Sequence, residues 1–375
     1  MYIRERGRTG LARWCVLGLL CSCASDYEVI PGPVDVDPGE VTECDFTQLD
    51  DTDFYAYDCN PVFTTTGEDW APAIGSTDFG VTSVLGHAFY QLWYTGVPED
   101  EDGYGDYGLG YAVSTNGTDW NPHGENPMLE EPGSGAWDAS NMDALQVIWD
   151  PTGAQYVMLY QGYNLDSDDW GLGVATSADG KNWSRLPNNP VLDLTSSVGD
   201  VQAWCWPLGI SLGRTEGFTG YIAGMRAGST SCELYAIEGS NAGSWTPIND
   251  RVLGAGSAGD WDDEGFLSVS TAELGGLHHM FYVGFGRWKN MGSYLQTQEQ
   301  FLGMATSTDG ETWTRESGPL PITETDVGAI GSVAALTVGE RIHLWVTDEY
   351  DDVSGVGLFL YDPDRAQSDD GEEGR

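Results

Sequence analysis

The stretch GLGVATSADGKNW, residues 171–183, decides the fold, because related copies of it recur along the chain. Two are close, GLGYAVSTNGTDW (108–120) and FLGMATSTDGETW (301–313), and one is divergent, ELYAIEGSNAGSW (233–245). Each copy predicts a β-strand, a tight hairpin turn of the Asp-Gly kind and a tryptophan that pins the hairpin to the core. The four tryptophans are spaced by 63, 62 and 68 residues, which suits four-stranded propeller blades with their loops.

Further phrases recur in step with these hairpins. Asn-Pro before two apolar residues follows two of the hairpins and predicts a short outer edge strand, where proline is tolerated. A loop with a tryptophan and then two apolar strands come next, and a fifth copy has three strands but no tryptophan. The phrases are Asn-Pro at 126–129 and 189–192, a weaker Gly-Pro-Leu at 318–320, strand pairs such as 145–150 with 155–162 and 267–271 with 278–286, and the fifth copy at 332–338, 341–348 and 355–362.

The two ends of the repeat array indicate how the ring closes. Asn60-Pro61-Val62-Phe63 has no blade before it, and the fifth copy stops after its third strand near Asp362. Docking the N-terminal strand there supplies the missing outer strand and removes an exposed edge. The prediction is therefore an all-β, five-bladed β-propeller closed by an N-terminal strand, over residues 44–362, followed by a disordered acidic tail at 363–375.

The N-terminus predicts an exported protein. Four arginines precede a short apolar run, so residues 1–22 are typical of a signal peptide and too short for a stable membrane span. Leu20-Cys21-Ser22-Cys23 resembles the bacterial lipoprotein signal, which implies lipidation of Cys23; the alternative is an ordinary signal peptide. Residues 23–43 predict a flexible acidic tether. Ala24 after the lipidated cysteine favours, by the same resemblance, the outer membrane of the cell envelope.

Cysteine usage agrees with export. Cys44, Cys59, Cys205 and Cys232 remain once the signal and Cys23 are set aside, and four cysteines in an oxidising compartment suggest two disulfides. Three pairings are possible, and 44 with 59 and 205 with 232 are favoured because they are local. No cysteine or histidine cluster with zinc-ligand spacing is present, so a zinc site is not expected.

The charge balance excludes one class of partner. The formal net charge is −44, with 59 acidic and only 15 basic residues, so nucleic acid is not an expected ligand. We interpret the many acidic residues as a solvated surface. We also expect the protein to be a monomer. Asp100, Asp102 and Asp106 surround two glycines in one loop, a composition that suits calcium, although a hydrated loop without an ion is the alternative.

The hairpins and Asn-Pro strands resemble those of the five-bladed propeller glycosidases, which include arabinanases, xylosidases, invertases and levansucrases. The resemblance covers about residues 60–362 and rests on scaffold motifs. It implies an aspartate base or nucleophile on the inner strand of blade one, an aspartate in blade three that tunes its pKa, and a glutamate general acid in blade four. Such chemistry needs one ionised and one protonated carboxyl group across the sugar.

Carried over residue by residue, the resemblance gives catalytic candidates. Aligned on LWYTG, MLYQG and MFYVG, the residues Asp78, Asp143 and Glu264 fall within about one residue of a common register, with Asp78 as base and Glu264 as acid. Blade three departs from the pattern, because Trp206 stands at that register and Asp200 lies six positions earlier. Asp78 also lacks the neighbouring proline usual in the family. The alternatives are a turn cap for Asp78 and a solvated or cation-binding side chain for Glu264.

Aromatic and basic residues supply candidates for substrate binding. The tryptophans are either core residues or sugar-stacking platforms, and the arginines either pair with carboxylates or position a ligand. The candidates are Trp137, Trp204, Trp206, Trp261, Arg226 and Arg287. Three functions follow: a surface lipoprotein that recognises glycan at the channel mouth, an active glycoside hydrolase on furanoside-type or related polysaccharides, or a structural or protein-interaction propeller of the envelope.

Overall fold

The computed structural model describes part of the chain. The described residues are 2–5, 27–30, 44–64, 71, 73–84, 87–97, 108–130, 132–133, 135–164, 166–167, 169–195, 201–212, 217–286, 289–290, 296–297, 300–322, 330–350 and 353–364. All regular elements in these ranges are β-strands, so the all-β prediction is confirmed. None of the described residues belongs to a helix long and apolar enough to cross a membrane.

The chain divides into two compact units, Met1–Glu43 and Cys44–Arg375. In the first unit β1 (Tyr2–Glu5) pairs antiparallel with β2 (Tyr27–Ile30). The other residues of the predicted signal peptide and tether, including Cys23, lie outside the described residues, and those assignments stay predictions.

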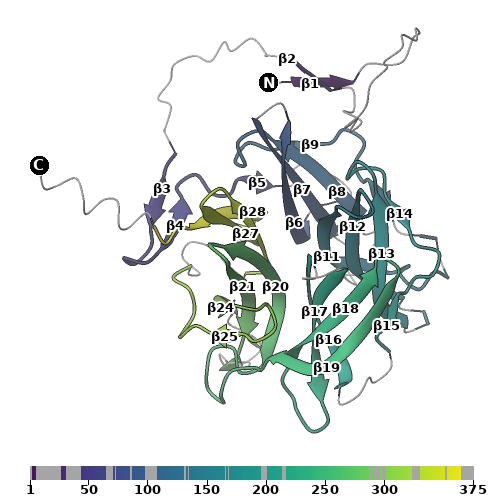
Figure 1. Ribbon diagram of the computed structural model, residues 1–375, viewed down its shortest axis with the longest axis vertical. Helices are drawn as coiled ribbons and strands as arrows, with labels where there is room; N and C mark the ends of the chain where they lie inside the picture. The colour runs from purple at the N-terminus through teal and green to yellow at the C-terminus, as the bar shows by residue number, and fades with distance from the viewer. Residues whose placement is uncertain are drawn as a thin grey trace, which may run out of the picture. The chain divides into compact units, whose positions relative to one another are not determined.

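The second unit is a five-bladed propeller of small antiparallel sheets (Figure 1). Blade one holds β6 (Ala73–Val84), β7 (His87–Val97), β8 (Gly108–Ser114), β9 (Asn121–Pro122) and β10 (Leu129–Glu130). Blade two holds β11 (Asn141–Asp150), β12 (Gln155–Asn164), β13 (Asp169–Ser177), β14 (Ser184–Arg185) and β15 (Leu192–Asp193). Blade three holds β16 (Val201–Leu212), β17 (Phe218–Arg226), β18 (Glu233–Asn241) and β19 (Ser244–Leu253).

Blades four and five complete the ring. Blade four holds β20 (Gly265–Leu274), β21 (Leu277–Phe285), β24 (Gln300–Ser307) and β25 (Thr314–Arg315), and β22 (Lys289–Asn290) pairs with β23 (Gln296–Thr297) in its long connection. Blade five holds β26 (Ser332–Val338), β27 (Arg341–Tyr350), β28 (Val353–Tyr361), β4 (Phe54–Tyr57), β3 (Phe46–Gln48) and β5 (Phe63–Thr64). The inner strands contact one another in the cyclic order β6, β11, β16, β20 and β26.

N-terminal strands close the ring, as predicted. In Figure 1 the yellow β28 lies beside the purple β4 and β5, and the register pairs Phe63 with Val356 and Tyr55 with Leu360. The closing strand β5 begins at the end of the predicted segment 60–63. The β3–β4 hairpin is an addition that the sequence did not suggest, and it extends the edge of the blade beyond β28.

The hydrophobic core is divided among the gaps between neighbouring blades. Each gap holds its own cluster of buried apolar side chains, contributed by the two blades that face it. Trp183, Trp245 and Trp313 of the repeated hairpins belong to these clusters, and each is less than a tenth exposed. The hairpin tryptophans of blades two, three and four are therefore core residues, as expected.

Both favoured disulfides are present. Cys44 is bonded to Cys59, with the Cα atoms 5.7 Å apart, and fastens the β3–β4 hairpin at its base. Cys205 on β16 is bonded to Cys232 directly before β18, with the Cα atoms 6.2 Å apart. Pairing cysteines that are close in the sequence thus predicted both disulfides correctly.

Candidate functional site

Glu264 lies directly before the inner strand of blade four, which begins at Gly265. Its backbone N–H donates to the Phe285 carbonyl (3.1 Å), and its carbonyl accepts from the Cys232 N–H of blade three (2.9 Å). The residue is partly buried. Its backbone is therefore fixed from two sides, once within its own blade and once by the neighbouring blade.

Trp261 and Asp262, near the end of the connection between β19 and β20, pack within blade four. The Trp261 ring stacks on Tyr282, with ring centroids 5.7 Å apart and planes 8° apart. Asp262 is fully buried, accepts from the Tyr282 hydroxyl (3.3 Å) and forms an ion pair with Arg315 (3.0 Å). Burial raises the pKa of Asp262, while the Arg315 guanidinium opposes that rise. Trp261 is thus partly buried and packs against the core cluster between blades three and four.

Blade two repeats this arrangement. Trp137 stacks on Tyr160 with centroids 5.8 Å apart, the Tyr160 hydroxyl donates to buried Asp138 (2.8 Å), and Arg185 pairs with the same carboxylate (3.0 Å). Burial and the neighbouring Asp138 carboxylate raise the pKa of Tyr160. Trp137 is likewise partly buried and packs against the core cluster between blades one and two. The backbones of Trp204 and Trp206 lie on β16, and their side chains are outside what the structure describes.

Asp78 is buried within β6 and holds two blades together. Its Oδ1 accepts from the Phe79 N–H (2.9 Å), and its Oδ2 accepts from the Val147 N–H on the inner strand of blade two (2.5 Å). Burial raises the pKa of Asp78 to about 7, although both backbone donors act to lower it. Both carboxylate oxygens thus serve the protein's own backbone. The turn-cap alternative does not describe this contact, because Asp78 lies inside a strand.

Ser270 makes the same contact between blades four and five. Asp78 pairs across its sheet with Trp93, and Ser270 pairs with Phe281, the equivalent residue of blade four. The Ser270 hydroxyl accepts from the Ala335 N–H (3.0 Å), as Asp78 accepts from the amide of blade two. A side-chain oxygen at this position therefore accepts a backbone N–H from the neighbouring inner strand. A hydroxyl oxygen makes this contact in blade four where a carboxylate oxygen makes it in blade one.

The predicted common register of the three carboxylates is wrong. Asp78 faces the second residue of LWYTG, Asp143 faces Gln161, the fourth residue of MLYQG, and Glu264 bonds to Phe285, beyond the end of MFYVG. The physical reason is that the hairpins differ in length, because five residues of β7 precede the shared phrase but only three residues of β12 and of β21. In blades two and four a β-bulge between the carboxylate and the hairpin shifts the register further, whereas the bulge of blade one lies beyond Asp78 and leaves its register unchanged.

The arginine candidates have separate outcomes. Arg226 at the end of β17 forms an ion pair with Glu233 (3.0 Å) and donates to the Tyr235 hydroxyl (2.9 Å), which fits the carboxylate-pairing alternative. Arg251 binds the other oxygen of Glu233 (2.6 Å), a partnership that the sequence analysis missed. Arg287 lies outside the described residues.

The calcium prediction also falls outside the structure's described part. Asp100, Asp102 and Asp106 all belong to the undescribed residues, so the loop keeps both of its interpretations. Among the described residues, no group of three or more His, Cys, Asp or Glu side chains is arranged to hold a metal ion.

A cavity of about 450 Å³ lies between blade four and the N-terminal segment of blade five. Its lining includes Asp53, His279, Glu316 and Tyr361. Burial and the nearby Asp362 carboxylate raise the pKa of Asp53. No residue predicted for the channel-mouth site lines this cavity, so it is a feature separate from that site.

Comparison with known proteins places the fold. No protein-family model matches the sequence, and no curated protein matches it significantly. A glycosyl hydrolase from Bacteroides ovatus superposes with a TM-score of 0.57 at 17% identity, over 82% of this chain and 92% of its own. The β-1,2-mannobiose phosphorylase of Listeria innocua gives 0.59 at 12% identity, over 84% and 98%. A thermostable family-43 glycoside hydrolase gives 0.54 at 17%, over 80% and 91%. The chain therefore has the five-bladed propeller fold of these glycoside hydrolases and phosphorylases.

Proposed function

We propose that the propeller recognises a glycan at the channel mouth around Glu264. The proposal rests on the backbone hydrogen bonds of Glu264. One bond lies within blade four and the other comes from blade three, and together they hold the residue at the start of an inner strand. The resemblance to the propeller glycosidases implies a general acid in blade four, for which Glu264 is the candidate. Proteins with the same fold act on sugars, among them a β-1,2-mannobiose phosphorylase and a β-fructofuranosidase.

Recognition is favoured over hydrolysis by an Asp78–Glu264 pair. A glycosidase base or nucleophile must face the sugar or its attacking water. Both oxygens of Asp78 accept from backbone amides instead, and a serine makes the equivalent contact in blade four. If the protein does hydrolyse a glycoside, Asp143 is the better candidate for the base. Counted along the shared phrase of the second strand, the position that Asp143 faces is two residues closer to that of Glu264 than the position that Asp78 faces.

A glycan screen tests the proposal. The purified chain is passed over arabinan, levan and β-1,2-mannan, and incubated with sucrose, scoring retention and release of reducing sugar separately. Glu264→Gln is compared with Glu238→Gln, which alters an exposed carboxylate on β18. Retention without sugar release supports recognition if Glu264→Gln weakens it about tenfold or more and Glu238→Gln does not. Loss of one charge-assisted contact lowers affinity by about this factor.

Other outcomes of the screen decide between the alternatives. Sugar release by the wild-type chain that disappears in Glu264→Gln identifies a hydrolase, because an amide keeps the shape of the acid but donates no catalytic proton. Indifference to every glycan contradicts the proposal and leaves the interaction propeller.

We also propose that the protein is exported and held in the cell envelope by a lipid on Cys23. The support is the arginine-rich start, the short apolar run and Leu20-Cys21-Ser22-Cys23. Cys23→Ala should abolish acylation and move the protein from the membrane fraction to the soluble one. Membrane retention of the unacylated variant would contradict the lipid anchor.

Calcium binding by the loop of Asp100, Asp102 and Asp106 is proposed on composition alone. Low calcium concentrations in moderate salt should raise the melting temperature, because ligand binding to the native state stabilises it. The double variant Asp102→Asn/Asp106→Asn should lose that rise. A rise that sodium reproduces at equal ionic strength indicates screening rather than a site.

A further inference from the structure

The connection between β17 and β18 of blade three contacts the backbone that carries Glu264. The Ser231 hydroxyl donates to the Asp263 carbonyl (3.0 Å), and the Cys232 N–H donates to the Glu264 carbonyl (2.9 Å). Cys232 also forms a parallel β-bridge with Gly265. Two consecutive residues of blade three therefore bind two consecutive carbonyls at the candidate site.

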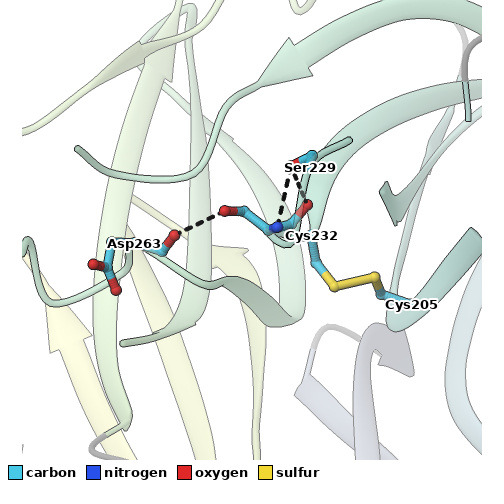
Figure 2. The surroundings of a disulfide bond; sticks show 5 residues. Cys205, Ser229, Cys232 and Asp263 are labelled. Atoms are coloured by element: carbon cyan, nitrogen blue, oxygen red, sulfur yellow. Dashed lines mark hydrogen bonds between the residues drawn. A yellow bond between two sulfur atoms is a disulfide. The ribbon is translucent and has the colours of Figure 1, made fainter. Parts of the chain in front are cut away.

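The blade-three side of this contact is cross-linked. Cys232 is bonded to Cys205, which is buried on the inner strand β16, and Figure 2 shows the disulfide on one side of the segment that ends at Cys232 and Asp263 on the other. The Ser229 hydroxyl accepts from the Ser231 N–H (3.1 Å), so the turn before Cys232 is also internally bonded. The disulfide thus ties the contacting residues to the inner strand β16 of blade three.

The blade-four side of the contact is fitted closely to Cys232. Gly265 has a φ of +128°, which only glycine adopts without strain. A Cβ atom at this position would lie 2.3 Å from the Cys232 carbonyl oxygen and 2.8 Å from the Cys232 Cβ. The two segments are therefore packed backbone against backbone at the start of β20.

We infer that the Cys205–Cys232 disulfide is a positioning element for Glu264, in addition to its effect on the unfolded chain. A disulfide stabilises any domain by restricting its unfolded state. Here one of the bonded residues also donates to the Glu264 carbonyl, so breaking the cross-link releases the segment that fixes the backbone of this residue. Cys205, Ser231 and Cys232 act through Glu264 and are positioning residues. The inference rests on the proposed function only for its consequence in glycan binding.

Amide hydrogen exchange tests the positioning directly. The double variant Cys205→Ser/Cys232→Ser should speed exchange of the residue-232 and Glu264 amides at least about tenfold, whereas the Leu92 amide in blade one should change much less, because the opening is local. The matched control is Cys44→Ser/Cys59→Ser, which removes the other disulfide and should speed exchange of the residue-232 and Glu264 amides no more than that of the Leu92 amide. Equal acceleration at residue 232, Glu264 and Leu92 would show a purely global effect and overturn the inference.

A milder variant covers the case in which the double variant does not fold. Ser231→Ala keeps the disulfide and removes only the hydroxyl that donates to the Asp263 carbonyl. It should speed exchange of the Glu264 amide severalfold without lowering the melting temperature by more than a few degrees. An unchanged Glu264 amide in this variant would contradict the positioning role of the segment.

The glycan assay separates the two proposals. If the wild-type chain retains a glycan, Cys205→Ser/Cys232→Ser should weaken retention about tenfold or more, and Cys44→Ser/Cys59→Ser should not. If the wild-type chain retains none, the proposed function fails, and the exchange rates alone decide whether the disulfide positions Glu264. Undiminished retention by the Cys205→Ser/Cys232→Ser variant would overturn the inference.

Discussion

At the scale of single residues, the buried acids of blades two and four are balanced by an arginine from the outer strand of the same blade. In both blades the aspartate follows a loop tryptophan, and the arginine comes two residues after the hairpin tryptophan. Blade one has neither charge at these positions. The pairs are Asp138 with Arg185 and Asp262 with Arg315, against Ala71 and Pro122 in blade one. In these three blades the aspartate and the arginine are either both present or both absent, because a buried charge without a partner is costly in free energy.

Removing one partner of such a pair should destabilise the protein strongly. Arg185→Met leaves Asp138, whose side chain is only 2% exposed, without its cation, and we expect the free energy of unfolding to fall by about 2–4 kcal/mol. Arg251→Met is the control, because Arg251 is 46% exposed and its ion pair should contribute at most about 1 kcal/mol. Urea unfolding followed by tryptophan fluorescence measures both. Equal losses in the two variants would contradict the burial argument.

Asp78 should make stability depend on pH. Burial raises its pKa to about 7 in the folded protein from 3.8, so the folded state binds the proton more tightly than the unfolded state does. This contribution is fully present below about pH 4 and is lost as the pH rises through 7. Relative to Asp78→Asn, the wild-type chain should therefore lose up to about 4 kcal/mol between pH 4 and 8, since one pKa unit corresponds to about 1.4 kcal/mol.

The comparison at each pH isolates this group. The other carboxylates of the chain titrate in both proteins, so their effect cancels in the difference between wild type and Asp78→Asn. The difference in unfolding free energy is measured by urea titration at several pH values and constant ionic strength. A difference that stays constant or grows with pH would show that Asp78 is ionised in the folded protein throughout.

At the scale of elements, the Asn-Pro phrase has a specific task in the outer edge of a blade. The outer edge is split into two very short strands, and the asparagine side chain bonds the backbone of the third strand in the gap between them. Its amide thereby takes the place of a strand residue. The pairs are Asn60 with Leu358, Asn126 with Tyr111 and Asn189 with Val174. The outer strands predicted at these phrases are confirmed, and each begins two residues after its proline.

The asparagine side chain should therefore be needed for blade stability. Asn189→Ala removes the acceptor for the buried Val174 N–H (3.0 Å), and we expect a loss of about 2–3 kcal/mol, since an unsatisfied buried amide is costly. The adjacent Asn188 is exposed and donates only to the Gly243 carbonyl, so Asn188→Ala should change stability by less than about 0.5 kcal/mol. Thermal melting of the two variants gives the ranking, and a reversed ranking would refute it.

At the scale of the whole propeller, stability depends on joining the first strands to the last. β26, β27 and β28 have no partner of their own for the outer edge, and β4 and β5 provide it from almost 300 residues earlier in the chain. The gap between blades five and one contains Phe63 of β5 together with Trp345 and Phe79. Closure therefore adds both backbone pairing and apolar burial to the ring.

Deleting residues 44–64 should impair folding of the entire propeller. The deletion exposes the edge of β28 and removes Phe63 from the core, so we expect aggregation or a melting temperature lower by more than about 10 °C. The control is Cys44→Ser/Cys59→Ser, which keeps the strands and loses only their cross-link, and it should melt at an intermediate temperature. An unchanged melting temperature for the deletion would show that closure contributes little.

The sequence by itself determined the number of blades, their hairpins, the closing strand and both disulfides. These features depend on contacts within a blade or on the ends of the repeat array, so the periodic pattern of residues expresses them directly. The place of each carboxylate was decided only by tertiary structure. Asp78 bonds an amide 69 positions away in another blade, and Glu264 is held by Cys232 of blade three. Such contacts depend on hairpin lengths, bulges and the packing of inner strands around the ring, which no repeat within one blade encodes.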